Sequence, residues 1–374
     1  MKKLLSVLLA TMMVVSLVAC GQSSGPAATS NAGAQKETFD LALVTDLGTI
    51  DDKSFNQGAW EGLVKYANEK GISHKYYQPQ EAGTNAYFET IELAIEGGAK
   101  LVVCPGYLFE EPVYMAQQQY PDIHFVLLDG EPHNADYSDY KTGANTMPIL
   151  YQEDQAGFLA GYAAVKDGNT KLGFLGGMAV PAVIRFGLGY VQGIDAAAKE
   201  LGVQCDVKYN YTGQFAATPE AQALAASWYN TGTEVVFGCG GAVGNSAMSA
   251  AEGKNQQEGS FVAKVIGVDV DQYSESDTVI TSAMKMLSNS VYDAITMYYN
   301  GNFPGGKTTT FNVKNDGVGA AMDHAKFNTF TKADYDVLYA DLKGGKYNIK
   351  NDVTESDPSK ADLGLTNTTV TFIQ

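Results

Sequence analysis

The sequence from Phe39 to Gly62, FDLALVTDLGTIDDKSFNQGAWEG, contains the pattern from which we predict the fold of this chain. It begins with an apolar run of strand length, FDLALVT, and continues through a polar turn into a segment with helical periodicity. In that segment Ala59, Trp60 and Leu63 recur on one face, and Gly71 follows as a stop signal. A strand that leads through a turn into a helix begins a βαβ unit, and repeated βαβ units predict a parallel sheet.

The same alternation continues along the rest of the chain. Further apolar runs of strand length are KLVVC, IHFVLL, KLGFL, DVKYNY, EVVFG and KVIGV. Between them lie helical patterns such as AYFETIELAIE, QEDQAGFLAGYAAVK, EAQALAASWYN and a long one from Ala182 to Leu201. With so many units the sheet must split in two, and the length of the chain is sufficient for two lobes. We therefore predict an α/β fold with two doubly wound, Rossmann-like lobes.

The residues that directly follow these strands form a regular pattern. Asp46, Asp129 and Asp269 each follow a strand, Phe215 follows DVKYNY in the segment TGQF, and Gly240 follows EVVFG. A single Asp-Gly after a strand is usually only a turn. In open α/β sheets, however, ligands bind beyond the carboxyl ends of the strands. Because the pattern occurs in both halves of the chain, we predict a ligand cleft at the hinge between the two lobes.

The N-terminus predicts where the protein works. MKKLLSVLLATMMVVSLVAC has Lys2 and Lys3 ahead of an apolar segment that ends in small residues, which is typical of a secretory signal and not of a membrane span. Its end resembles a bacterial lipobox, so that Cys20 would carry a lipid; the alternative is an ordinary signal with a chance cysteine. We predict a lipoprotein signal peptide at 1–19, and the lipidated cysteine with a flexible tether at 20–37. This places the protein on the extracytoplasmic face of a cell membrane.

Composition and charge narrow the function of the remaining chain. The sequence is 45% apolar and 18% charged, as in ordinary globular proteins, and its formal net charge of −17 argues against a nucleic-acid partner. Cys104, Cys205 and Cys239 stand apart in apolar runs, which favours buried free thiols over disulfides. We assign 38–147 and about 272–303 to an N-terminal lobe, and 148–271 and about 304–374 to a C-terminal lobe.

The sequence offers little support for an enzyme. The four histidines stand apart without metal-ligand spacing, and neither a G-x-S-x-G elbow nor a phosphate-binding loop is present. The run from Gly238 to Gly244 follows a strand, but its G-x-G-x-x-x-G spacing does not fit a dinucleotide fingerprint. Its glycines are better explained by close approach of the backbone to a ligand. We predict no catalytic residue, no metal site and no cofactor.

The acidic residues of the opening stretch have two different explanations. Asp51 and Asp52 precede a helix N-terminus, where negative charge is favourable, and Ser54 with Gln57 fits a capping box. A calcium loop would need ligands at alternate positions and a closing glutamate, which the stretch lacks. We therefore interpret Asp51 and Asp52 as residues that start the helix, and leave Asp46 as the candidate for ligand binding.

Two phenylalanines at strand ends are candidates for stacking on a ligand ring. Phe55 lies in the first turn of its helix, away from the buried stripe, and Phe215 follows a strand in the other half of the chain. Stacking of a base on an aromatic side chain contributes about 1–3 kcal/mol. A plain core aromatic is the alternative at Phe55. In the stacking interpretation, Asp46, Asp129 and Asp269 would accept hydrogen bonds from hydroxyl or ring N–H groups.

Taken together, these residues resemble the basic membrane protein family, which comprises lipoprotein substrate-binding proteins of ABC transporters and includes the purine nucleoside receptors. The resemblance extends from Phe39 to about Val318. It rests on VTDLGTIDDKSFNQGAWEG, LLDG, YTGQF, GCGGAVG, GVDVDQ and VITSAMK. It implies a fold like that of type I periplasmic binding proteins, with two lobes that are joined by three crossovers and close on a nucleoside.

The resemblance also implies roles for individual residues at the base of the ligand. Phe55 and Phe215 would sandwich the purine, and Phe186 would form a further aromatic wall. Asn56 and Asp129 would bind polar edges of the base.

Other residues would bind the sugar. Asp46, Asp269 and Lys285 would hold the ribose hydroxyls, and Gly240 would present its backbone to the sugar. Two features depart from the family pattern. The segment between Asp269 and Lys285 looks short, and YTGQFAATPE lacks the acidic residue expected soon after the phenylalanine.

The function that we expect is that of a lipid-anchored receptor without enzymatic activity. It would capture nucleosides, with purine nucleosides as the expected ligands, and deliver them to the permease of an ABC importer through hinge closure. Two alternatives remain open. The same fold could bind a sugar or a signalling molecule, or the protein could be an extracellular nucleoside hydrolase that uses Asp46 or Asp129 as a base.

Overall fold

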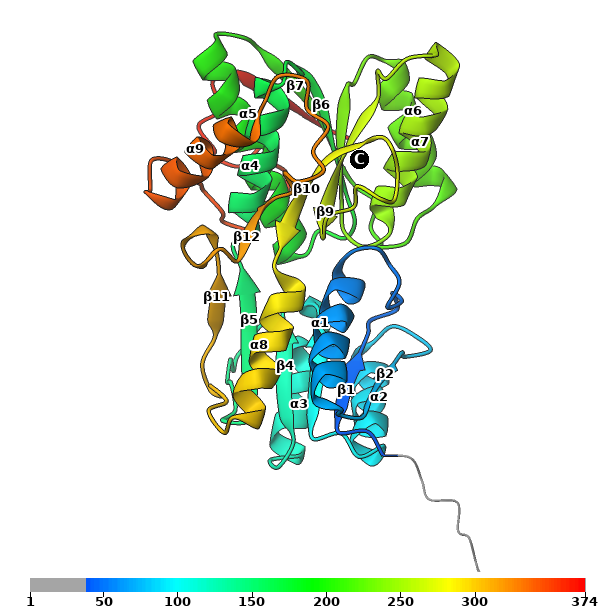
Figure 1. The fold of residues 1–374 in the computed structure, drawn as a ribbon, viewed down its shortest axis with the longest axis vertical. Helices are drawn as coiled ribbons and strands as arrows, with labels where there is room; N and C mark the ends of the chain where they lie inside the picture. The colour runs from blue at the N-terminus through cyan, green and yellow to red at the C-terminus, as the bar shows by residue number, and fades with distance from the viewer. Residues whose placement is uncertain (1–37, 374) are drawn as a thin grey trace, which may run out of the picture. The chain divides into compact units, whose positions relative to one another are not determined.

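Residues 38–373, which a computed structural model describes, form two α/β lobes around two separate sheets (Figure 1). The signal peptide and the tether that the sequence predicts at 1–19 and 20–37 lie outside these described residues. Among residues 38–373, no helix combines the length and the apolar character that crossing a membrane requires.

The first lobe is built on a six-stranded sheet in the order β11-β5-β4-β3-β1-β2, in which all neighbours are parallel. Its strands are β1 (Leu41–Val44), β2 (His74–Tyr77), β3 (Leu101–Pro105), β4 (His124–Leu128), β5 (Thr146–Tyr151) and β11 (Thr309–Phe311). Its helices are α1 (Phe55–Lys70), α2 (Thr84–Glu96), the 3-10 turn η1 (Tyr107–Phe109), α3 (Glu110–Gln119) and α8 (Leu287–Tyr299).

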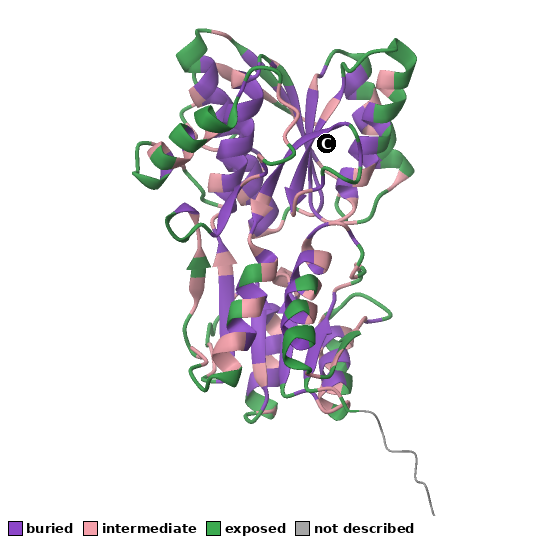
Figure 2. Cartoon of the chain, viewed as in Figure 1, coloured by how far each residue is buried: buried purple, intermediate pink, exposed green. Residues whose placement is uncertain are grey.

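Helices cover both faces of this first sheet, as the period-2 alternation of strand side chains requires. Leu41 and Leu43 of β1 share a core with Leu63 of α1. Ala42 and Val44, which point to the opposite face, share a different core with α2 and α3. Because both faces are covered, the central strands β1, β3, β4 and β5 are almost entirely buried while the outer helix surfaces are exposed (Figure 2).

The second lobe is built on a seven-stranded sheet in the order β12-β10-β9-β8-β6-β7-β13, in which only β12 runs antiparallel to its neighbour. The strands are β6 (Lys171–Gly176), β7 (Cys205–Tyr211), β8 (Val235–Cys239), β9 (Lys264–Asp269), β10 (Val279–Lys285), β12 (Val318–Ala320) and β13 (Thr368–Phe372). The helices are α4 (Glu153–Lys166), α5 (Pro181–Leu201), α6 (Pro219–Asn230), α7 (Val243–Glu258), η2 (Val313–Asn315) and α9 (Lys332–Lys343).

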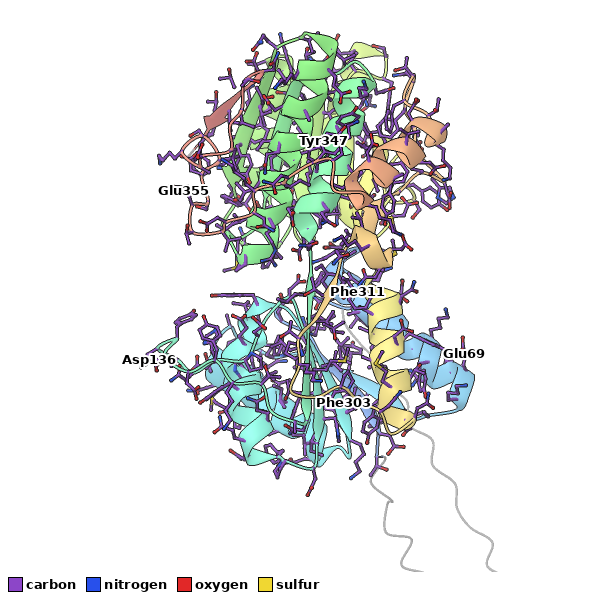
Figure 3. The ribbon with its side chains drawn as sticks, turned by 90° about the vertical axis from the view of Figure 1, so that its left-hand side faces the viewer. Glu69, Asp136, Phe303, Phe311, Tyr347 and Glu355 are labelled. Carbon is purple, nitrogen blue, oxygen red and sulfur yellow. The ribbon has the colours of Figure 1, made fainter. Side chains whose placement is uncertain are left out.

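The chain passes between the two lobes three times, as the family resemblance implies. It leaves the first sheet after β5, returns to the first lobe after β10, and leaves again between β11 and β12. Tyr151 and Phe311 end two of the strands at these crossovers, and their ring centroids lie 5.6 Å apart. Figure 3 shows Phe311 where the chain runs from one lobe to the other. The predicted two-lobed, doubly wound α/β fold is therefore confirmed.

The lobe boundaries differ from the predicted ones at each crossover. Strand β5 continues beyond residue 147 in the first sheet, and β11, which we placed in the second lobe, pairs with β5. Strand β10 lies within the segment 272–303 that we assigned to the first lobe, but it pairs with β9 in the second sheet. Within that segment, α8 packs on the first lobe against α1, and the ring of Phe303 contacts His124 of β4. The physical reason is that a strand belongs to the sheet in which it forms backbone hydrogen bonds. The pattern of apolar residues along the sequence does not reveal which strand is its partner.

Candidate functional site

A cleft of about 780 Å³ lies between the lobes, at the carboxyl ends of the strands of both sheets. The structure brings all nine residues that the sequence predicted for ligand binding into its wall. These are Asp46, Phe55, Asn56, Asp129, Phe186, Phe215, Gly240, Asp269 and Lys285. The volume falls within the range of about 300–1,000 Å³ that is typical of small-molecule sites.

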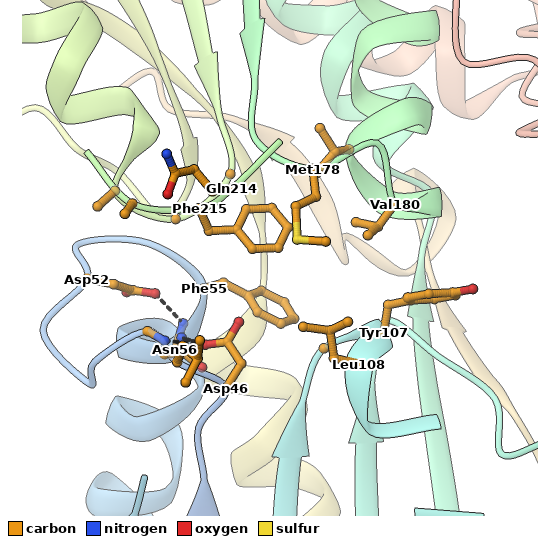
Figure 4. Close-up of a pocket in the computed structure, with 18 of the residues that line it drawn as sticks. Asp46, Asp52, Phe55, Asn56, Tyr107, Leu108, Met178, Val180, Gln214 and Phe215 are labelled. Atoms are coloured by element: carbon orange, nitrogen blue, oxygen red, sulfur yellow. Dashed lines mark hydrogen bonds between the residues drawn. The ribbon is translucent and has the colours of Figure 1, made fainter. Parts of the chain in front are cut away.

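Two aromatic rings face each other across the cleft (Figure 4). Phe55 is the first residue of α1 in the first lobe, and Phe215 lies in the loop between β7 and α6 of the second lobe; both are half-buried. Glycines allow the backbone to pass close behind Phe215, since an added Cβ would lie 2.4 Å from its Cδ1 at Gly177 and 3.0 Å at Gly240. Phe186 is buried deeper, with its ring centroid 5.9 Å from that of Phe237.

Asp46 and Asn56 form a hydrogen-bonded pair in the wall of the first lobe. Asn56 Nδ2 donates to Asp46 Oδ1 at 3.0 Å, and the Gly48 N–H donates to the same oxygen at 2.7 Å. Burial raises the pKa of Asp46, against the opposing effect of these hydrogen bonds. Asn56 Oδ1 is buried and has no hydrogen-bond partner among the described residues. The pair therefore has hydrogen-bond acceptors to offer to a ligand.

A buried charge cluster surrounds Lys285, at the crossover from β10 to α8. Its Nζ lies 2.6 Å from Asp129 Oδ2, 3.3 Å from Asp269 Oδ1 and 3.7 Å from Glu153 Oε1. Glu153 Oε2 also accepts a hydrogen bond from Arg185 Nε at 2.6 Å. Burial alone would lower the pKa of Lys285, but the attraction of the three carboxylates raises it above its usual range. Lys285 is therefore charged.

Asp129 is the carboxylate of this cluster with the most strongly perturbed environment. It is 6% exposed, and its Oδ1 has no hydrogen-bond partner among the described residues. Burial raises its pKa to about 7, although Lys285 acts in the opposite direction. Asp129 and Asp269 also share a left-handed backbone, with φ of 61° directly after β4 and 67° at the last residue of β9. Strained backbone of this kind is concentrated at functional sites.

The start of α1 corrects one prediction and confirms another. Asp52 caps the helix, since its Oδ1 accepts from the N–H groups of Ser54 (2.8 Å) and Gln57 (3.1 Å) and its Oδ2 from Asn56 (3.0 Å). The predicted capping box is wrong, because the Ser54 side chain makes no cap hydrogen bond. Ser54 Oγ instead donates to Asp269 Oδ2 at 2.5 Å, which links α1 to the second lobe. Asp51 is exposed and accepts a hydrogen bond from Thr49, so the helix-start interpretation is confirmed for Asp52 and not for Asp51.

The structure groups the polar residues differently from the roles that the family resemblance implies. Those roles put Asp46 with Asp269 and Lys285 at the sugar, and Asn56 with Asp129 at the base. Instead, Asp46 bonds to Asn56, while Asp129 and Asp269 meet at Lys285. The short segment before Lys285 does not displace this lysine, because Met284 pairs with Asp269 in the sheet.

Sequence reasoning missed several parts of the site. Glu153 and Arg185 complete the charge cluster, and Glu153 follows β5, a strand that we did not recognise because Pro148 interrupts it. Four apolar residues of the cleft wall also escaped notice: Tyr107, Leu108, Met178 and Val180. Tyr107 and Leu108 follow KLVVCPG, and the rule that ligands lie beyond strand ends could have pointed to them.

Other predictions concern metals and thiols. Within residues 38–373, no group of three or more histidine, cysteine, aspartate or glutamate side chains is arranged to hold a metal ion. Cys104, Cys205 and Cys239 are buried free thiols, as predicted.

Comparison with known proteins adds independent information. The family described as "ABC transporter substrate-binding protein PnrA-like" matches residues 39–343. The "ABC transporter nucleoside-binding protein BmpA" of Lactococcus lactis subsp. cremoris is 32% identical over 314 residues, which are 80% of this chain and 86% of that protein. "Basic membrane protein A" of Borreliella burgdorferi is 30% identical, over 75% of this chain and 78% of that protein.

Solved structures support the fold. A solute-binding protein of an ABC transporter system from Aeropyrum pernix K1 superposes with a TM-score of 0.72, over 84% of this chain and 94% of that chain. The two sequences are only 20% identical, so this likeness concerns the fold alone.

Proposed function

The chain belongs to the PnrA-like family of ABC transporter substrate-binding proteins, and from this premise we propose that it captures purine nucleosides and presents them to an ABC importer. The observation that carries the proposal is the chemistry of two adjoining groups of the cleft. The first, which we call the base end, combines two facing rings with the Asp46–Asn56 pair. The second, which we call the sugar end, holds carboxylates around Lys285, whose Nζ lies 4.3 Å from the centroid of the Phe55 ring. A nucleoside likewise combines a flat base with a polyhydroxyl sugar.

At the base end, we assign stacking to the two phenylalanines and edge recognition to the Asp46–Asn56 pair. A base between Phe55 and Phe215 would cover both half-buried rings. Asn56 Nδ2 donates one of its two N–H groups to Asp46, and the Oδ1 of Asn56 is a buried acceptor without a partner among the described residues. Ring N–H and exocyclic amino groups of purines are donors that fit this acceptor.

At the sugar end, we assign the ribose hydroxyls to the cluster around Lys285. Asp129 Oδ1 is buried without a partner among the described residues, so a hydroxyl donor would satisfy it. Lys285 has three N–H donors, and hydrogen bonds of hydroxyls with charged groups are stronger than neutral ones. Gly240 lines the cleft with φ of 119°, and a Cβ at this position would lie 3.0 Å from Cδ1 of Phe215.

Ligand binding would favour closure because the site is divided between the lobes. Phe55 and Asp129 belong to the first lobe, Phe215 and Asp269 belong to the second, and Lys285 lies at a crossover. A ligand that contacts both lobes stabilises the closed arrangement by its additional contacts there. The permease would recognise this closed form, and a lipid on Cys20 would hold the protein on the extracytoplasmic face of the membrane.

A ligand panel tests this proposal. Titration calorimetry with inosine, guanosine, adenosine, uridine, ribose and glucose should show binding of the purine nucleosides and much weaker binding of the sugars. Tight binding of a sugar with no response to nucleosides would replace the proposal by the sugar-binding alternative. Chromatography of inosine after incubation with the protein should show no free base, and stoichiometric excess of free base would identify a hydrolase.

A further inference from the structure

One part of the cleft wall has no role in the binding of a nucleoside as described above. Tyr107 and Leu108 of the first lobe and Met178 and Val180 of the second line the cleft and are all half-buried. In Figure 4 these four side chains lie on the other side of the two phenylalanine rings from Asp52 and Asn56. We refer to Tyr107, Leu108, Met178 and Val180 as the apolar wall.

Local backbone features place the apolar wall at the cleft. In the first lobe, Gly106 has φ of 119°, which lets the chain turn directly from β3 into η1 and present Tyr107 and Leu108. The hydroxyl of Tyr107 lies 3.1 Å from that of Tyr137, a residue outside the cleft lining, so this polar group is already satisfied. In the second lobe, a tight turn in which the Val180 N–H donates to the Met178 carbonyl at 2.8 Å leads into α5.

The charges around the cleft restrict what this wall can receive. Among the described residues of the cleft lining, Lys285 is the only lysine or arginine, and its ammonium group already faces three carboxylates. The lining also contains Asp46, Asp51 and Asp52. A phosphate group would therefore meet mainly negative charge in this cleft, whereas an uncharged apolar group would cover the exposed parts of four apolar side chains.

We propose that the apolar wall receives an apolar substituent on the 5′ carbon of the nucleoside, so that the protein also binds 5′-thioether nucleosides. This inference rests on the proposed function. If the base edge is held by Asp46 and Asn56 and the 2′ and 3′ hydroxyls are held around Lys285, the 5′ carbon is the position that has no assigned polar partner. A cleft of about 780 Å³ offers room beyond that of a plain nucleoside.

Calorimetry with three matched ligands tests the inference on the wild-type protein. 5′-Methylthioadenosine should bind about three- to tenfold more tightly than adenosine, because its methylthio group would be buried against the apolar wall. Adenosine 5′-monophosphate should bind at least tenfold more weakly than adenosine. Binding of 5′-methylthioadenosine more weakly than adenosine would overturn the inference while leaving the proposed function intact. Failure of all nucleosides to bind would instead refute the proposed function.

A variant tests whether the apolar wall determines the preference for a methylthio group on the 5′ carbon. Val180 is the N-cap residue of α5, a position where aspartate is favoured, so Val180→Asp should fold. It should weaken binding of 5′-methylthioadenosine at least tenfold more than binding of adenosine. The matched control is Val262→Asp at an exposed valine outside the cleft lining, which should change neither affinity. An equal loss for both ligands in Val180→Asp would show that the wall serves closure and would overturn the inference.

Discussion

Lys285 is the residue on which the charge balance of the cleft depends. It is 3% exposed and has carboxylates of three different elements within 3.7 Å. A buried ion pair contributes little net stability, but removal of one partner leaves the other charges uncompensated in a medium of low polarity. Both the stability of the protein and the position of the ligand-binding carboxylates should therefore depend on this side chain.

We expect Lys285→Met to lower the free energy of unfolding by about 3–5 kcal/mol, because Asp129, Asp269 and Glu153 would lose their shared cation. Urea unfolding at pH 7 measures the effect. Lys332→Met is the control, since Lys332 pairs with Asp336 at the surface and its loss should matter little. Equal stability of both variants would contradict the importance that we give to the cluster.

The raised pKa of Asp129 should make the stability of the protein depend on pH. Its pKa in the folded protein is about 7, above the value of about 4 for an unfolded chain, because burial disfavours its charge. Between these values the folded state holds a proton that the unfolded state has released. The stability that Asp129 contributes is thus fully present below about pH 4 and is lost as the pH rises through about 7. Relative to Asp129→Asn, the wild type should become less stable across this range in urea unfolding; a constant difference would contradict the assignment.

Phe55 should contribute to affinity without being needed for the fold, because it is half-buried at the first position of α1. We expect Phe55→Ala to weaken binding of inosine by about tenfold or more, as loss of one stacking face predicts. Calorimetry measures the affinity and circular dichroism the fold. The control is Phe261→Ala, at a ring that is 46% exposed outside the cleft lining, and a similar loss there would remove the stacking role of Phe55.

At the scale of elements, Asp52 and Ser54 at the start of α1 have different roles. Asp52 holds three backbone N–H groups of the first turn, while Ser54 bonds to Asp269 of the other lobe. We expect Asp52→Ala to destabilise the protein by about 0.5–2 kcal/mol through loss of the cap. Ser54→Ala leaves the cap hydrogen bonds intact and should mainly change ligand affinity. Thermal unfolding and calorimetry of both variants test this division, and a reversed pattern would contradict it.

The elements also show how far sequence reasoning reaches. Apolar runs such as FDLALVT and KVIGV are strands because their side chains face helices on both sides of a sheet, and such runs are visible in a sequence. Short or polar edge strands, such as HKYY in β2, lack this signal because only part of their surface is buried. The rule that ligands bind beyond the carboxyl ends of strands correctly predicted that Asp46, Phe55 and Phe215 lie at one cleft. It did not reveal that Asp46 pairs with Asn56, since pairing depends on side-chain geometry across elements.

At the scale of the whole described chain, polar contacts join the lobes near the crossovers. Ser54 reaches Asp269, and Gln272 Nε2 donates to the Lys53 carbonyl at 2.7 Å. Lys285, the last residue of β10, also contacts Asp129 of the first lobe. These contacts connect the loop ahead of α1 to the strand ends of the second lobe, close to the residues that we propose to bind a nucleoside.

Calorimetric titration of the protein with inosine, hypoxanthine and ribose compares a whole nucleoside with its two parts. We assign the base to Phe55, Phe215 and the Asp46–Asn56 pair, and the sugar to the cluster around Lys285. We therefore predict that inosine binds at least about a hundredfold more tightly than either part, because only the whole nucleoside contacts both groups of residues. Equal or tighter binding of hypoxanthine or ribose alone would contradict this assignment.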